Sequence, residues 1–208
     1  MISFEEVKKY LPHYLSAESQ SELFEDLKKF PNNIDQRFYS YSLTKDENFY
    51  QGDGVRKLLI TNLPNAEIKP LPSIILSNTC DISPQNERLF PTRILYAPIF
   101  QLAKYREALI EDHVQTNKID ITKIDSHIES IKKQIVTQVL FLPKGANLQN
   151  DSIVFLDRIN NCPVNELIKE KCNSDKLFTL SNYGNYVFLI KLSIHLTRIR
   201  EGVDRILQ

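Results

Sequence analysis

The sequence has no surplus of either charge. Its 26 Lys and Arg residues balance 26 Asp and Glu residues, so the formal net charge is zero. Proteins that bind a nucleic-acid backbone usually carry extra cations, because neutralising phosphates releases counterions. The overall charge therefore gives no support for nucleic-acid binding and leaves only a local basic face as a basis for it.

Long apolar segments are also absent. The apolar runs at residues 73–76 and 187–190 are far shorter than the ~20 residues that a membrane helix needs. Residues 1–6 show no basic stretch leading into an apolar one, which is the pattern of a signal peptide. We therefore expect no association with a membrane.

Cysteine is scarce as well. The three cysteines, Cys80, Cys162 and Cys172, are an odd number and match neither a disulfide framework nor the paired spacing of a zinc site. Such usage is typical of a reducing compartment. The sequence thus predicts a cytoplasmic protein, and we expect neither a metal nor a cofactor.

The N-terminal part, residues 1–33, has the pattern of two helices. Ser3 and Glu6 form a capping box that predicts a short helix from this point. A second helix is expected from Ser16, with apolar side chains at helical spacing and an end at residues 31–33. Its predicted apolar face consists of Leu23, Phe24, Leu27 and Phe30.

Short strands are expected in two blocks, residues 37–100 and 137–180. These strands are apolar or alternating segments bounded by Gly, Pro, Asn or Asp. Prolines between residues 64 and 72 predict a loop, since proline removes a backbone donor. The predicted strands cover residues 37–43, 55–61, 73–77, 93–99, 137–142, 152–158 and 177–180.

Two further helical regions follow from the apolar spacing. Residues 101–136 read as a helical insertion between the two strand blocks. Residues 184–205 read as an amphipathic C-terminal helix whose predicted apolar side holds Val187, Ile190, Ile194, Thr197 and Val203. If a stripe in the insertion were exposed, it would be a surface for a second copy or a partner protein. That stripe consists of Ile124, Ile128, Ile131 and Ile135.

Together these elements predict a single α+β domain over residues 1–208. Its centre would be a small curled sheet or an SH3-like barrel. The N-terminal helices, the helical insertion and the C-terminal helix would surround it.

Two segments stand out as candidate sites. The first is the turn at residues 50–54, where two glycines flank Asp53. The second begins at Asn78, where an apolar strand runs into small polar side chains, an arrangement that often presents a functional site. Its residues are Asn78, Thr79, Cys80 and Asp81. In each case the structural alternative is only a turn.

Nucleophilic or phosphate chemistry would need help from the C-terminal helix. Cys80 would require a histidine such as His195 for activation, because the neighbouring Asp81 disfavours a thiolate. His195 and Arg198 are three residues apart and share a helix face, and Arg200 follows. These cations could bind phosphate groups, or they could form a solvated last turn that the helix dipole favours.

A metal-dependent nuclease is a further alternative. Asp53 with Glu67 and Lys69 matches the loose pattern in which carboxylates hold Mg²⁺ and a lysine orients water. The neighbouring prolines favour solvated loop charges instead.

The order of three segments resembles the MazF/PemK-like toxin barrel. These are the Gly52-Asp53 turn, the strand at residues 72–77 that begins with proline, and the strand at residues 93–99 that ends in Ala-Pro-Ile. The resemblance covers residues 52–100. It implies a ribonuclease barrel with an arginine before the proline and a catalytic hydroxyl after Pro-Ile. Here Leu71 precedes Pro72, Lys69 is the nearest cation, and Phe100 takes the place of the hydroxyl.

Two hypotheses follow. The first is a non-catalytic binding or regulatory module on such a barrel, engaging a protein or RNA in a bacterial toxin–antitoxin or phage-defence setting. The second is a nuclease, with RNA as its expected substrate and with Asp81, His195 and Cys80 as catalytic residues. Its binding residues would be Asp53, Asn78, Thr79, Arg198 and Arg200. The nuclease requires the Gly-Asp turn and the loop at residues 78–81 to converge.

Overall fold

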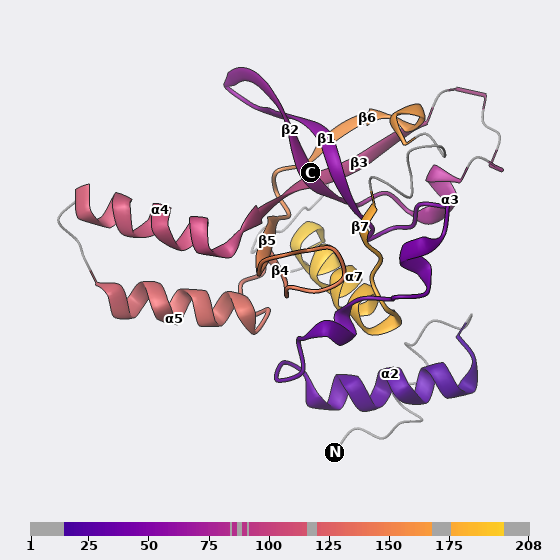
Figure 1. Ribbon diagram of the computed structural model, residues 1–208, viewed down its shortest axis with the longest axis horizontal. Helices are drawn as coiled ribbons and strands as arrows, with labels where there is room; N and C mark the ends of the chain where they lie inside the picture. The colour runs from indigo at the N-terminus through magenta and orange to yellow at the C-terminus, as the bar shows by residue number, and fades with distance from the viewer. Residues whose placement is uncertain are drawn as a thin grey trace, which may run out of the picture.

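The computed structural model describes residues 15–83, 85–86, 89–90, 92–115, 120–167 and 176–197. These residues form one antiparallel sheet of seven strands and five α-helices (Figure 1). The strands are β1 Gly54–Asn62, β2 Asn65–Ile75, β3 Arg93–Gln101, β4 Val139–Leu142, β5 Ser152–Phe155, β6 Asn160–Pro163 and β7 Lys176–Phe178. The helices are α2 Ala17–Lys29, α3 Thr79–Ile82, α4 Leu102–Gln115, α5 Ile121–Lys132 and α7 Asn182–Leu196.

The sheet is open. Its order is β4-β5-β3-β2-β1-β7, and β6 pairs with β3 on the edge opposite β2. In the described residues no pairing joins β4 to β7, so the strands do not close into a barrel. The predicted α+β class is therefore confirmed, whereas the SH3-like barrel is not.

β4 and the end of β2 are buried on both faces, and successive side chains of each strand pack into different cores because they point to opposite faces. In β4, Leu140 and Leu142 pack toward α7, while Val139 and Phe141 pack toward α4 and α5. In β2, Ile74 lies in the α7 core and Ile75 lies in a core with β6 and α3. Short, continuously apolar strands such as β4 are the expected result.

The α2 helix begins at the predicted residue. Ser16 caps it by accepting a hydrogen bond from the Ser19 amide at 3.2 Å. Leu23 and Phe24 are buried, and α2 lies beside α7 (Figure 1). The helix predicted from Ser3 lies outside the described residues.

No helix in the described part of the chain combines the length and apolar character needed to cross a membrane.

The α7 helix is confirmed, but its predicted buried side is right only at Val187, which is 4% exposed. Ile190 and Ile194 are 41% and 47% exposed, whereas Phe188 and Lys191 are buried. The reason is tertiary: the Lys191 ammonium donates to the carbonyls of Gln134 and Val136, so a cationic side chain lies on the buried face. The predicted continuation beyond residue 197 lies outside the described residues.

The strand predicted at residues 37–43 is also wrong. Phe38 and Tyr39 are adjacent and both buried, so the polar–apolar alternation does not separate two faces. The chain instead turns through short 3₁₀ segments at Gln36–Phe38 and Leu43–Lys45. The Asp35 carboxylate stabilises the first by accepting the Arg37 amide at 3.0 Å.

The proline-rich segment predicted as a loop is the long strand β2. Backbone amides alternate in direction along a strand, and the Ile75 amide donates to Asp53 on the β1 side. The nitrogens of Pro70 and Pro72 therefore face away from β1, and no donor is lost from the β1–β2 ladder. This pairing forms a hairpin that extends beyond the rest of the sheet (Figure 1).

The helical insertion is confirmed as α4 and α5, which extend together to one side of the sheet (Figure 1). Its isoleucine stripe is mostly buried, with Ile124, Ile128 and Ile131 at most 6% exposed. Only Ile135 of the stripe is exposed, at 64%. The stripe packs on β4 and β5 and does not offer a second copy or a partner protein a continuous docking surface.

The free edge of β4 is covered by a side chain. Gln134 donates from Nε2 to the Phe141 carbonyl at 2.7 Å and accepts the Phe141 amide at 3.1 Å. The Gln134 side chain thus replaces a neighbouring strand at this point and blocks edge-to-edge pairing. It does so from a left-handed backbone conformation with φ of 59°.

Gln134→Ala is expected to lower the free energy of unfolding by about 2 kcal/mol, because it leaves a buried amide and a buried carbonyl unpaired. Denaturant titration measures this. Gln134→Glu would place a buried carboxylate against the Phe141 carbonyl, so we expect a loss at least as large at neutral pH. A loss in the alanine variant no larger than that of an exposed Gln138→Ala variant would contradict this role.

Candidate functional site

The Gly-Asp turn and the loop at residues 78–81 converge. The Gln51 amide donates to Thr79 Oγ1 at 3.0 Å, and Gln51 Nε2 donates to the Leu76 carbonyl at 2.8 Å. The loop itself is the short helix α3, capped by Asn78, whose Oδ1 accepts the Cys80 amide at 2.9 Å. The contact required by the nuclease hypothesis is therefore present between the backbone of one segment and the side chain of the other.

Asp53 does not take part in this junction through its carboxylate. Its Oδ2 lies 3.0 Å from Lys176 Nζ, and neither side chain has any exposed surface. The same oxygen accepts the Tyr50 amide at 3.0 Å. Oδ1 has no hydrogen-bond partner within the described residues. The predicted binding residue thus forms a buried ion pair with β7.

Lys176 connects three parts of the chain. Besides Asp53, its ammonium donates to the Asn48 carbonyl at 2.7 Å and to the Leu43 carbonyl at 3.3 Å. It also lies 5.2 Å from the centre of the Tyr50 ring. The ion pair therefore anchors the segment that leads into the Gly-Asp turn. Sequence reasoning missed Lys176, because nothing local distinguishes a lysine that begins a short strand.

Burial raises the pKa of Asp53 to about 6, and the positive charge of Lys176 opposes this rise. The carboxyl group is therefore still mainly ionised at pH 7, as the ion pair requires. Its position inside the fold gives it no open side from which to accept a proton from a substrate.

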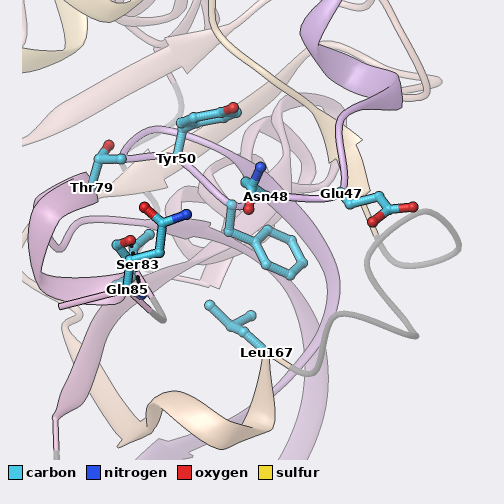
Figure 2. Close-up of a pocket in the computed structure, with 9 residues that line it drawn as sticks. Glu47, Asn48, Tyr50, Thr79, Ser83, Gln85 and Leu167 are labelled. Carbon is cyan, nitrogen blue, oxygen red and sulfur yellow. Dashed lines mark hydrogen bonds between the residues drawn. The ribbon is translucent and has the colours of Figure 1, made fainter. Parts of the chain in front are cut away.

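A pocket of about 170 Å³ lies where the turn and α3 meet (Figure 2). Thr79, Ser83 and Gln85 lie along one side, Asn48 lies across from them, and Leu167 is below. The carboxylate of Glu47 points away from the other labelled side chains (Figure 2). The complete lining is Glu47, Asn48, Phe49, Tyr50, Thr79, Ile82, Ser83, Gln85 and Leu167.

The chemistry of this lining is mostly uncharged. Amide and hydroxyl groups come from the turn and α3, and apolar groups come from Phe49, Ile82 and Leu167. Tyr50 already donates its hydroxyl to Asp46 at 2.9 Å, which raises the pKa of Tyr50 together with burial, the larger cause. Lys, Arg and His are absent from the lining within the described residues.

The remaining predicted catalytic residues are not gathered at this pocket. Cys80 is exposed and Asp81 is partly buried on α3, and neither lines the pocket. His195 is in the last turn of α7, one turn after Lys191, which binds Gln134 and Val136 near the end of α5. Arg198 and Arg200 lie outside the described residues.

The metal-nuclease pattern is dispersed in the same way. Glu67 and Lys69 form an exposed ion pair of 2.9 Å on the hairpin, whereas Asp53 is buried with Lys176. Within the described residues, no three His, Cys, Asp or Glu side chains are grouped so that they could hold a metal ion.

The positions singled out by the barrel resemblance share a second hollow. Lys69, Leu71 and Phe100 all line a groove of about 420 Å³ beside the β1–β2 hairpin. This groove is lined by a different set of residues from the pocket of Figure 2.

The chain matches no protein-family model and no curated protein.

Proposed function

We propose that the chain is a non-catalytic binding module that takes a segment of a protein partner into the pocket between the Gly-Asp turn and α3. One observation carries this proposal: Asp53, the acid of the Gly-Asp turn, is turned into the fold and held by Lys176 at 3.0 Å. Apart from Glu47, whose carboxylate points away from the other labelled side chains (Figure 2), the groups on the pocket wall bind and do not transfer protons at neutral pH.

The electrostatics of the pocket favour a peptide over RNA. Each phosphate of an RNA needs a cation or a strong donor nearby, and the lining provides no Lys or Arg, only the carboxylate of Glu47. A nuclease would also need groups that stabilise the charge that develops on the phosphorus. The first turn of the 15-residue helix α7 packs near the Gly-Asp turn, whereas His195 is at the opposite end of this helix.

A peptide matches the same lining. The side chains of Asn48, Thr79 and Gln85 can pair with backbone amides and carbonyls, while Phe49, Ile82 and Leu167 offer an apolar floor. Ligand sites in proteins commonly combine a few polar groups with an apolar wall. The barrel resemblance adds the toxin–antitoxin or phage-defence setting, which stays a prediction.

The first test is a cleavage assay with the purified chain. Single-stranded and structured RNA and DNA are incubated with Mg²⁺ or with EDTA, and we expect no cleavage in any of them. The Asp81→Ala and His195→Ala variants are run in parallel. Cleavage by the wild type that disappears in either variant would establish the nuclease and refute the proposal.

The second test measures peptide binding directly. Peptides selected from a random displayed library against the wild-type chain are titrated against Gln85→Trp, which fills the pocket from an exposed position. We expect binding to weaken at least tenfold. Lys104→Trp, on the exposed side of α4, is the matched control and should bind unchanged. Equal affinity for both variants would exclude this pocket as the binding site.

A further inference from the structure

The groove beside the β1–β2 hairpin is a second candidate site, distinct from the pocket described above. The hairpin forms one wall, the end of β3 forms the floor, and the turn at residues 157–160 forms the other wall. The Thr61 amide donates to Asn160 Oδ1 at 2.9 Å, so the two walls are joined at one end. The volume of about 420 Å³ is in the range of a ligand site.

Arg158 is the distinctive side chain of this groove. Its guanidinium carbon lies 4.1 Å from the centre of the Phe155 ring and 5.5 Å from the centre of the Phe100 ring. In the part of the chain that the structure describes, the guanidinium forms no ion pair and donates no hydrogen bond. Stacking orients the planar group and leaves its donors available for a carboxylate.

Besides Arg158, the groove wall carries one ammonium and two carboxylates. Lys69 and Glu67 are already paired with each other at 2.9 Å. Asp157 lines the groove next to Arg158 in the chain, but the two side chains form no ion pair. The lining is thus formally neutral, and an anion that entered the groove would find the oriented donors of Arg158 on the wall opposite the Lys69–Glu67 pair.

The rest of the wall is largely apolar. Leu71, Pro98 and Phe100 line the interior, and the exposed residues Leu63 and Ile159 extend the apolar surface at its rim. Leu63 is 79% exposed at the tip of the hairpin. A polynucleotide would bring several phosphates to this single cation and would gain little from the apolar wall.

We propose that this groove binds an apolar peptide segment carrying one carboxylate, which Arg158 holds through a two-pronged hydrogen bond. Apolar side chains of the peptide would cover Leu71, Pro98 and Phe100. The two oxygens of the carboxylate would accept hydrogen bonds from the guanidinium, which has no acceptor within the described residues. This site is independent of the proposed peptide pocket at α3.

The test uses acetylated, amidated hexapeptide libraries of Leu, Ile, Pro and Phe with a single Asp, and the same libraries with Asn in place of Asp. Binding to the full chain is followed by fluorescence anisotropy, with hexauridylate as the RNA probe. We expect the Asp peptides to bind about tenfold more tightly than the Asn peptides. Arg158→Met should remove this preference and leave the Asn peptides unchanged.

Arg93→Met is the matched control. Arg93 is an exposed arginine at the start of β3, the strand whose end forms the floor of the groove. Its side chain donates to Asn161 and does not line the groove. It should retain the preference for Asp. Asp peptides that bind no better than Asn peptides, or show no binding at all, would overturn the proposal. So would hexauridylate binding that depends on Arg158. The Gln85→Trp variant should leave groove binding intact, which separates this result from the fate of the α3 pocket.

Discussion

Lys176→Met is expected to lower the free energy of unfolding at pH 7 by about 3–5 kcal/mol, the usual effect of removing one partner of a buried ion pair. The variant leaves the Asp53 carboxylate in the core without its cation, and neither side chain of the pair reaches solvent. It also leaves the carbonyls of Leu43 and Asn48 without the ammonium donor. Denaturant titration with two spectroscopic probes measures the loss.

The loss should depend on pH in a defined direction. Burial already raises the pKa of Asp53 to about 6, and removal of the Lys176 charge raises it further. An acid with a folded pKa above its unfolded value of about 3.9 gains stability as pH falls through the folded pKa. We therefore expect the variant to recover part of its stability between pH 7 and pH 5, when Asp53 becomes neutral.

A second substitution separates the lost charge from the lost packing. Asp53→Asn combined with Lys176→Met removes both charges and keeps an oxygen that can accept the Tyr50 amide. We expect the double variant to be more stable at pH 7 than Lys176→Met alone. Lys45→Met, at an exposed position, is the control and should change stability little. A double variant as unstable as the single one would contradict the electrostatic explanation.

Gly184→Ala is expected to destabilise the fold by about 3 kcal/mol, the upper part of the range for overpacking. A Cβ at this position would overlap with the backbone oxygen of Phe38. Because the obstacle is backbone, no side-chain rotation relieves it, and the start of α7 must move away from the segment at Gln36–Phe38.

Thermal unfolding provides the measurement for this variant. Alanine is a better helix former than glycine by about 1 kcal/mol, so helix propensity alone predicts that Gly184→Ala stabilises the fold. The close contact with Phe38 predicts the opposite. Asn182→Ala, at an exposed position in the same turn, is the matched control with an expected change below about 0.5 kcal/mol. A melting temperature for Gly184→Ala at or above that of the wild type would refute the close contact.

Local patterns were sufficient where one face of an element decides its structure. The apolar spacing of Ile124, Ile128 and Ile131 predicted a helix, and all three side chains are buried. Ser16 marked the beginning of α2 because its side chain caps the helix locally. Patterns failed where both sides of a segment are buried, as at Phe38 and Tyr39, since alternation no longer reports a solvent face.

The candidate site shows the same division. The strand that leads into residues 78–81 and the Gly-Asp turn were recognisable, because glycine, asparagine and short apolar runs have local conformational meaning. Their contact through Gln51 and Thr79 depends on the pairing of β1 with β2. The sequence did not predict this contact; it only indicated that the nuclease hypothesis requires it. The short helix α3 and the strand β6 had no periodicity long enough to predict them.

By itself, the sequence determined the α+β class, the positions of α2 and the helical insertion, and most of the strands, because these depend on residues close together in the chain. Only the tertiary structure decided that Asp53 faces Lys176, that Phe188 and Lys191 join Val187 on the buried side of α7, and that Arg158 stacks over Phe100. These contacts join residues brought together by strand pairing and core packing. The energies of these contacts depend on burial, which arises only when the segments pack together in the folded chain.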